Sequence, residues 1–158
     1  MTRIAVIADI HANHPALQAV IADIEEVGVD EVLVGGDLVG RGPQGRRVIE
    51  TIAERGWESI RGNHEDYVLQ FRRREVPDDW LVADIWAASR WMAEELEDWH
   101  AAYIDELPLS RTPETADGLR LFHGSPTSYH EGIGHWTSDE AIQEHLNSME
   151  ETLLVCAH

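Results

Sequence analysis

Lysine is absent from this chain of 158 residues, and all of its 12 basic residues are arginines. They face 30 acidic residues, so the formal net charge at neutral pH is −18. A surface of this sign repels the phosphate backbone of nucleic acids and anionic lipid headgroups, so we expect neither a nucleic-acid duplex nor a membrane as a partner. A salt-adapted proteome and GC-rich coding both account for such a composition, and the two explanations are compatible.

Cysteine and long apolar runs are scarce as well. Cys156 is the only cysteine, which excludes an intrachain disulfide and a zinc site built from cysteine pairs. No run approaches the roughly 18 apolar residues of a transmembrane helix, and the first apolar run breaks at Asp9, too early for a signal peptide. A chain of this length with 43% hydrophobic residues can bury one core. These features predict a cytoplasmic protein with a single domain over residues 1–158.

The first third of the chain alternates short apolar runs with helical periodicity. Buried strands are expected at 4–8, 32–34 and 57–60, with helices at 15–27, for which Asn13 is a candidate cap, and at 43–55. This alternation favours a mostly parallel sheet with helices packed on it. Later segments predict a hairpin of strands, then a helix and a final buried strand, at 109–112, 119–122, 138–148 and 152–155.

Residues 79–105 carry the longest helical pattern, with apolar residues from Leu81 to Tyr103 spaced by three or four positions. Trp80, Trp86 and Trp91 widen this apolar stripe. We interpret the segment as a long helix that packs on the core. An aromatic wall that faces a substrate is the alternative interpretation.

Residue types that bind metal ions follow five of the predicted strands. They are Asp9 and His11, then Asp37, then Asn63 and His64, then His123, and finally His158. Because ligands of open α/β sheets gather at the carboxyl ends of the strands, we expect these side chains to converge. The sequence therefore predicts a site with carboxylate, amide and imidazole groups.

Four short motifs stand in order along the chain: Asp9-Ile10-His11, Gly36-Asp37-Leu38-Val39-Gly40, Gly62-Asn63-His64-Glu65 and His123-Gly124. Together they resemble the motif series of the calcineurin-like metallophosphoesterases. The resemblance implies an α/β fold, a four-layer α/β/β/α sandwich with a two-metal centre between its loops. It also implies hydrolysis of phosphodiester or phosphomonoester bonds, in small molecules or nucleotides, by a hydroxide that two metal ions activate.

The same resemblance assigns roles to individual residues. Six would be metal ligands: Asp9 and His11 on the first ion, Asp37 bridging both ions, and Asn63, His123 and His158 on the second. Three would act on the substrate: His64 as the catalytic residue that assists the leaving oxygen, with Arg41 and Asn63 on the phosphate. The mixed nitrogen and oxygen ligands suit two divalent ions of Mn, Fe, Zn, Ni or Co.

The chain departs from the family pattern at two places. Ala157-His158 stands where the family has Gly-His, and the following x-His is absent, so we expect a domain that is incomplete at its C-terminus, with further strands missing. The segment 36–43 resembles protein phosphatases and dinucleoside-tetraphosphate hydrolases, except that Gly40 replaces an aspartate. Residues 122–126 instead resemble the small bacterial and archaeal phosphoesterases, which is the branch we favour.

Two alternatives to a small-molecule phosphoesterase stay open. One is a protein or dinucleoside-polyphosphate phosphatase, which Arg41 and Pro43 favour. The other is a non-catalytic interaction module on the same fold. Among the remaining histidines, His14, His130 and His135 are interpreted as surface residues with pocket lining as the alternative, and His100 and His145 as solvated helix positions.

Overall fold

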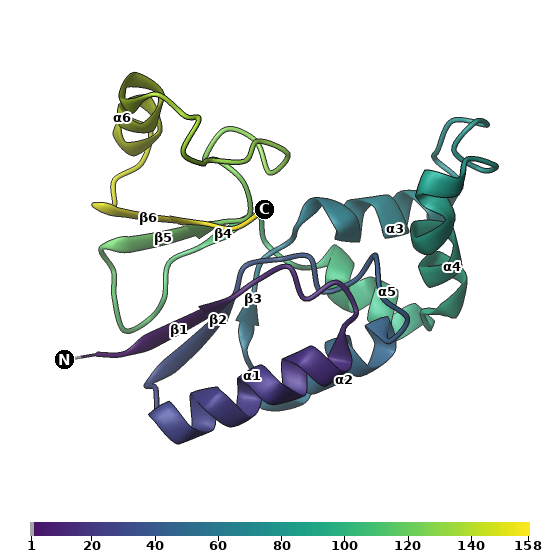
Figure 1. Ribbon diagram of the computed structural model, residues 1–158, viewed down its shortest axis with the longest axis horizontal. Coiled ribbons are helices and arrows are strands. Elements are labelled where there is room, and N and C mark those ends of the chain that lie inside the picture. The colour runs from purple at the N-terminus through teal and green to yellow at the C-terminus, as the bar shows by residue number, and fades with distance from the viewer. Residues whose placement is uncertain (1) are drawn as a thin grey trace.

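A computed structural model describes residues 2–158 and contains two small β-sheets flanked by helices (Figure 1). Three parallel strands form the first sheet in the order β1 (Ile4–Ile7), β2 (Glu31–Val34) and β3 (Glu58–Ser59). The helices α1 (His14–Val27) and α2 (Gly45–Arg55) connect them, as the alternation in the sequence predicts. Asn13 caps α1, because its side chain accepts the backbone N–H of Ala16.

The second sheet comes from the C-terminal half of the chain. In it, β5 (Leu119–Phe122) pairs antiparallel with β4 (Ser110–Arg111) and parallel with β6 (Leu153–Cys156). The expected strand pair is thus confirmed. The crossover from β5 to β6 contains the predicted helix, α6 (Asp139–Asn147), whose cap Ser138 accepts the N–H of Ala141.

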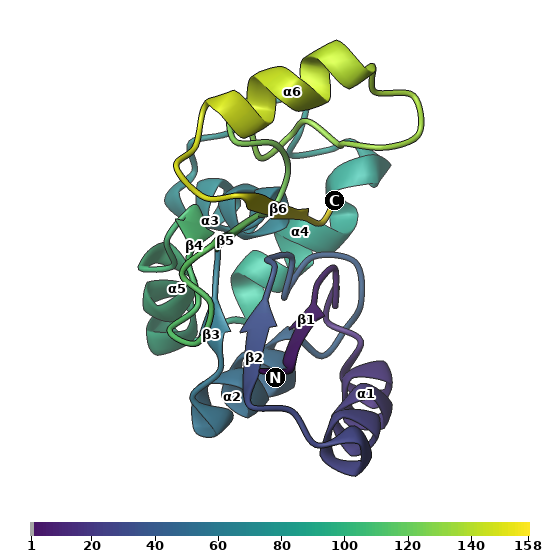
Figure 2. The same cartoon turned by 90° about the vertical axis from the view of Figure 1, so that its left-hand side faces the viewer.

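The two sheets face each other, with α1 and α2 outside the first sheet and α6 outside the second (Figures 1 and 2). Leu33, Ile60 and Leu121 are fully buried in the core between the sheets. A larger core lies between the first sheet and its helices, with Val34 and Ile49 among its buried residues. This arrangement is the four-layer α/β/β/α sandwich that the resemblance implies.

The single helix predicted over residues 79–105 is wrong. The segment forms a turn, a short 3-10 helix, η1 (Asp84–Trp86), and two separate helices, α4 (Ala87–Glu95) and α5 (Asp98–Asp105). The break lies at Leu96, whose ψ of 134° is extended. Both helices bury apolar residues in the same core, so the spacing of apolar residues stays regular through the break. The spacing therefore does not reveal that the chain changes direction at Leu96.

The interpretation of His100 and His145 as solvated helix positions is also wrong. His100 is fully buried, and its Nδ1 accepts the backbone N–H of Glu97 at the start of α5, while Nε2 lies 3.3 Å from Oε1 of Glu50. His145 is 8% exposed. Both side chains are buried on the inner face of their helices.

One further helix, α3 (Asn63–Arg73), is missing from the predicted elements. It begins inside the polar motif Gly62–Glu65, which suggests a loop when it is considered alone. Val68, Leu69 and Phe71 bury its inner face. The first turn of α3 therefore carries Asn63 and His64 at the edge of the first sheet.

No helix within residues 2–158 is long and apolar enough to cross a bilayer.

Candidate metal centre

The loops after β1 and β2 lie side by side beyond the carboxyl ends of these strands. The backbone N–H of Asp9 donates to the carbonyl of Gly36 (3.1 Å), and that of His11 donates to the carbonyl of Asp37 (2.8 Å). Asp9, His11 and Asp37 have φ angles of 52°, 48° and 54°, a left-handed region that residues with side chains rarely adopt. Strained backbone of this kind persists where neighbouring bonds hold it, and it concentrates at functional sites.

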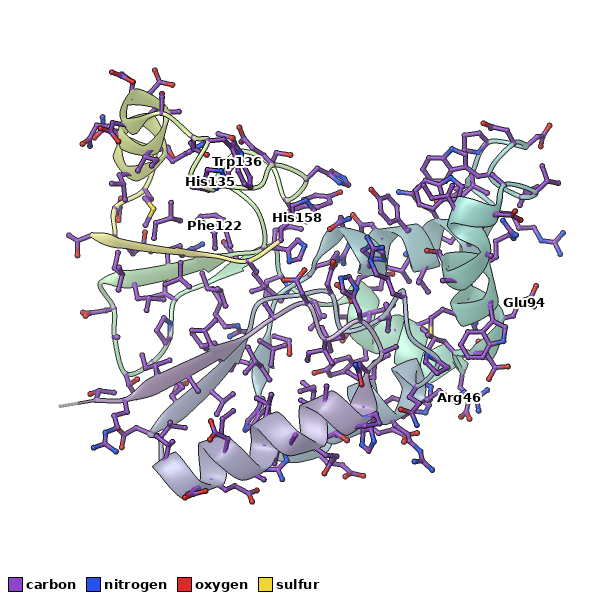
Figure 3. All side chains as sticks on the ribbon, in the orientation of Figure 1. Arg46, Glu94, Phe122, His135, Trp136 and His158 are labelled. Atoms are coloured by element: carbon purple, nitrogen blue, oxygen red, sulfur yellow. The ribbon has the colours of Figure 1, made fainter. Side chains whose placement is uncertain are left out.

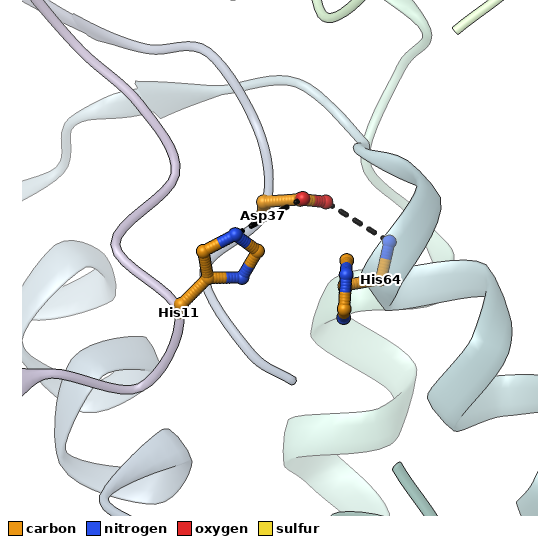
Figure 4. A group of neighbouring side chains, drawn as sticks. All are labelled: His11, Asp37 and His64. Atoms are coloured by element: carbon orange, nitrogen blue, oxygen red, sulfur yellow. Dashed lines mark hydrogen bonds and ion pairs between the residues drawn. The ribbon is translucent and has the colours of Figure 1, made fainter. Parts of the chain in front are cut away.

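A first group of ligand atoms surrounds Asp37, which lies between His11 and His64 (Figure 4). Nε2 of His11 lies 3.7 Å from Oδ1 of Asp9 and 3.7 Å from Oδ2 of Asp37. Nδ1 of His11 lies 3.3 Å from the carbonyl oxygen of Val39, which only accepts hydrogen bonds. The proton therefore resides on Nδ1, and the lone pair of Nε2 faces the same space as the two carboxylates, where a cation would satisfy all three acceptors.

A second group surrounds His123, which is fully buried. Its Nδ1 donates to the carbonyl oxygen of Gly35 (2.7 Å), so Nε2 carries a lone pair. That Nε2 lies 2.9 Å from Oδ1 of Asn63, 3.5 Å from Oδ1 of Asp37 and 3.3 Å from Nδ1 of His158. Amide, carboxylate and imidazole acceptors thus converge where a divalent cation would satisfy them, so the residues present fit a metal ion.

The two groups share Asp37, whose Oδ2 faces His11 and whose Oδ1 faces His123. Burial raises the pKa of the Asp37 carboxyl, and the neighbouring charge of Asp9 raises it further. Two carboxylates so close together repel each other, and cations between them remove that repulsion. Asp37 is thus the one residue with an oxygen atom in each of the two groups described above.

All six predicted metal ligands therefore meet at one place. The last of them, His158, follows β6 and lies between the second sheet and the loops of the first (Figure 3). Its backbone N–H donates to Oδ2 of Asp9 at 3.2 Å. This bond joins the segment after β6 to the loop after β1.

Comparison with known proteins places this chain in a family. Residues 2–158 match the family model of the calcineurin-like phosphoesterases. The chain belongs to this family. Its crystal relatives include a metallophosphoesterase from Sphaerobacter thermophilus, with a TM-score of 0.74 and 28% identity over 99% of this chain and 60% of that one.

Two curated proteins are similar in sequence. An uncharacterized protein of Methanocaldococcus jannaschii is 28% identical over 145 residues, which are 91% of this chain and 57% of that protein. A symmetrical bis(5'-nucleosyl)-tetraphosphatase of Delftia acidovorans is 29% identical over 143 residues, which are 86% of this chain and 47% of that protein. The chain thus spans about half the length of the curated relatives it matches.

Glu65, which sequence reasoning did not single out, holds the two ligand loops together. Its fully buried carboxylate accepts the backbone N–H groups of Gly62 (2.7 Å), Asp37 (2.9 Å) and Val39 (3.2 Å). The signal that marks it in the sequence is an acidic residue three positions after the helix cap, where such a side chain reaches back to backbone donors. Glu65 is therefore a positioning residue for the loops that carry Asp37 and Asn63.

The ring of His64 packs directly on Gly40, whose φ is 120°. A Cβ atom at Gly40 would overlap Nδ1 and Cγ of His64. This Nδ1 is buried and has no hydrogen-bond partner within residues 2–158. Burial lowers the pKa of His64 to about 4, so the ring is neutral at neutral pH. The missing side chain at Gly40 leaves the space that this ring occupies.

Arg41 is exposed beside the first group of ligand atoms. It lines a cavity of about 620 Å³ together with Asp9, His11 and Gln44. Burial lowers the pKa of His11, and the positive charge of Arg41 contributes to the lowering. Arg41 is thus close enough to the centre to attract an anionic group into this cavity.

The three histidines interpreted as surface residues differ in position. His14 contacts Thr51 and so bridges α1 to α2, away from the ligand groups. His135 is exposed in the segment before α6 (Figure 3). His130 is exposed as well, but its Nδ1 lies 3.4 Å from the hydroxyl oxygen of Tyr67, one helical turn beyond His64.

Proposed function

We propose that this chain hydrolyses phosphomonoester or phosphodiester bonds, in small phosphorylated molecules or nucleotides, with two divalent metal ions. The observation that carries the proposal is Asp37, which directs one carboxylate oxygen toward each ligand group. Its partners would be Asp9 and His11 on one ion and Asn63, His123 and His158 on the other. When bound, two such ions clamp the phosphoryl oxygens and lower the pKa of a water molecule that attacks phosphorus.

The proposal assigns His64 to the leaving oxygen. Because its lowered pKa keeps the imidazole neutral, the ring holds one proton, and the N–H group donates it as a hydrogen bond to that oxygen. Arg41 draws the phosphate toward a chain whose net charge of −18 repels it. Asn63 contacts the phosphate from the start of α3, where backbone N–H groups favour anions.

One relative supports a nucleotide as the substrate. The Delftia relative is a bis(5'-nucleosyl)-tetraphosphatase, which makes a dinucleoside polyphosphate the second candidate substrate for this chain. The acidic surface of this chain repels a nucleic-acid duplex and an anionic membrane, so it favours a small anion that only the metal centre attracts. A cytoplasmic location stays a prediction.

The deciding experiment follows the hydrolysis of bis-p-nitrophenyl phosphate with added Mn²⁺. We expect turnover that depends on the metal and that falls at least about 100-fold in His64→Ala, because loss of one positioned hydrogen-bond donor costs this much. His14→Gln is the matched control, since this histidine lies on α1 outside both ligand groups. It should retain the full rate.

Two results would count against the proposal. A rate that stays the same in His64→Ala would remove this residue from catalysis. Binding of Mn²⁺ without turnover of phosphodiesters, phosphomonoesters or dinucleoside polyphosphates would favour a non-catalytic module on the same fold.

A further inference from the structure

Aromatic side chains gather on one side of His64. Tyr67 follows it on the next turn of α3, and the two ring centroids lie 5.5 Å apart. The centroid of Trp86 lies 4.8 Å from that of Tyr67, and the centroid of Trp80 lies 6.1 Å from it. Two tryptophans from the segment 79–105 therefore support a tyrosine beside the proposed catalytic histidine, which revives the aromatic wall as an interpretation of that segment.

The loop after β5 contacts this aromatic group. The ring centroids of His130 and Tyr67 lie 5.9 Å apart, and the Tyr67 hydroxyl contacts Nδ1 of His130. The neighbouring Tyr129 donates its hydroxyl to Oδ2 of Asp66 at 2.6 Å. Two adjacent contacts thus tie the loop after β5 to α3, with His130 exposed at the rim.

The position of the leaving group gives Tyr67 and His130 a role. In the proposed function, His64 contacts the leaving oxygen, so the group attached to that oxygen extends past His64. Arg41 and its cavity lie on the His11 side. Outward from His64 along α3, the next ring is Tyr67, with His130 across from it.

We propose that Tyr67 and His130 form a subsite for an aromatic ring of the leaving group, a nucleobase in a nucleotide substrate. Base-to-aromatic stacking tolerates different bases, because every base has a π-face. The subsite would explain why tryptophans are gathered behind Tyr67: they fix its ring in place. This inference rests on the proposed function, because the proposed role of His64 decides on which side of the centre the leaving group lies.

The test measures binding rather than turnover. The probes are the methylene phosphonate analogues of adenosine 5'-monophosphate and of ribose 5-phosphate, which cannot be hydrolysed and differ only in the base. With Mn²⁺ present, calorimetry should show the adenosine probe bound about tenfold more tightly by the unaltered chain. In Tyr67→Ala the ratio should fall to about one, and Tyr67→Phe, which keeps the ring, should retain most of it.

Two further variants keep the test decisive if Tyr67→Ala fails to fold. His130→Ala changes an exposed residue and should reduce the preference about threefold. Trp91→Ala removes an exposed tryptophan of α4 that is outside the aromatic group, and it should leave the preference unchanged. Equal binding of both probes by the unaltered chain, or an unchanged preference in folded Tyr67→Ala or in His130→Ala, would overturn the subsite.

The outcomes separate this inference from the proposed function. A chain that prefers the adenosine probe and hydrolyses no ester supports the ring subsite and contradicts the phosphoesterase activity. A chain that hydrolyses esters and binds both probes equally contradicts the subsite alone.

Discussion

At the scale of single residues, the proton position on each histidine decides what the histidine can bind. His11 and His123 each direct Nδ1 to a backbone carbonyl oxygen, so each turns the lone pair of Nε2 toward Asp37. Such a bond fixes the ring orientation before any ion arrives. The motifs in the sequence indicate which residues are candidates, but the carbonyls of Val39 and Gly35 are backbone atoms that the side-chain pattern does not specify.

Gly40 provides a prediction at the same scale. Gly40→Ala places a Cβ atom against the His64 ring and strains a backbone with a φ of 120°. We expect His64 to shift and the hydrolysis rate to fall about 100-fold, as in His64→Ala, with Mn²⁺ binding at the second group retained. Kinetics with bis-p-nitrophenyl phosphate and calorimetry of Mn²⁺ binding measure the two effects.

Substitution of a second glycine is the control that separates the effect of backbone strain from the effect of contact with His64. Gly28 has a φ of 67°, and a Cβ atom there would meet nothing within 4 Å. Gly28→Ala should therefore cost about 1 kcal/mol of stability through backbone strain and leave the rate unchanged. If the two variants lose the same small fraction of activity, contact with His64 is not the reason for a glycine at position 40.

At the scale of elements, Glu65 connects the loop after β2 to the start of α3. Glu65→Gln replaces an acceptor oxygen by an amide group that faces backbone donors. We expect the free energy of unfolding to fall by about 2 kcal/mol and Mn²⁺ affinity to fall at least about tenfold, because the two loops lose their common acceptor. Urea unfolding and calorimetry measure these quantities.

The control for Glu65 is an acidic residue without such contacts. Glu94 is exposed on α4, so Glu94→Gln should change stability by less than about 0.5 kcal/mol and leave Mn²⁺ affinity intact. Metal affinity that survives in Glu65→Gln would show that the ligand loops keep their positions without this carboxylate.

The elements also show which parts of the fold can be predicted from the sequence. Strands β1, β2 and β5 are predicted because apolar residues in short runs have few other ways to be buried, and the ligand residues follow directly from their ends. The break at Leu96 is not predicted, because apolar spacing reports burial rather than direction. α3 is missed because its first turn consists of the same polar residues that form the site.

At the scale of the whole molecule, charge is the dominant feature. The net charge is −18, and the arginines that oppose it mostly form ion pairs that are partly exposed, such as Arg55 with Glu25 and Arg73 with Asp105. Exposed pairs contribute about 0–1 kcal/mol each. Self-repulsion of the acidic excess acts over longer distances than these pairs do, and it opposes the compact state.

Salt should therefore stabilise this chain. As KCl rises from about 0.02 M to about 0.3 M, the screening length falls below the size of the domain, and we expect the Tm at pH 7 to rise by several degrees. The same titration near pH 4.7, the isoelectric point of the sequence, is the internal control, because there the net charge is about zero and the rise should vanish. A Tm that falls with KCl at pH 7 would show that the arginine pairs outweigh the repulsion. A Tm that keeps rising toward molar KCl would favour salt adaptation over coding bias as the origin of the lysine-free composition, because screening is nearly complete well below that concentration.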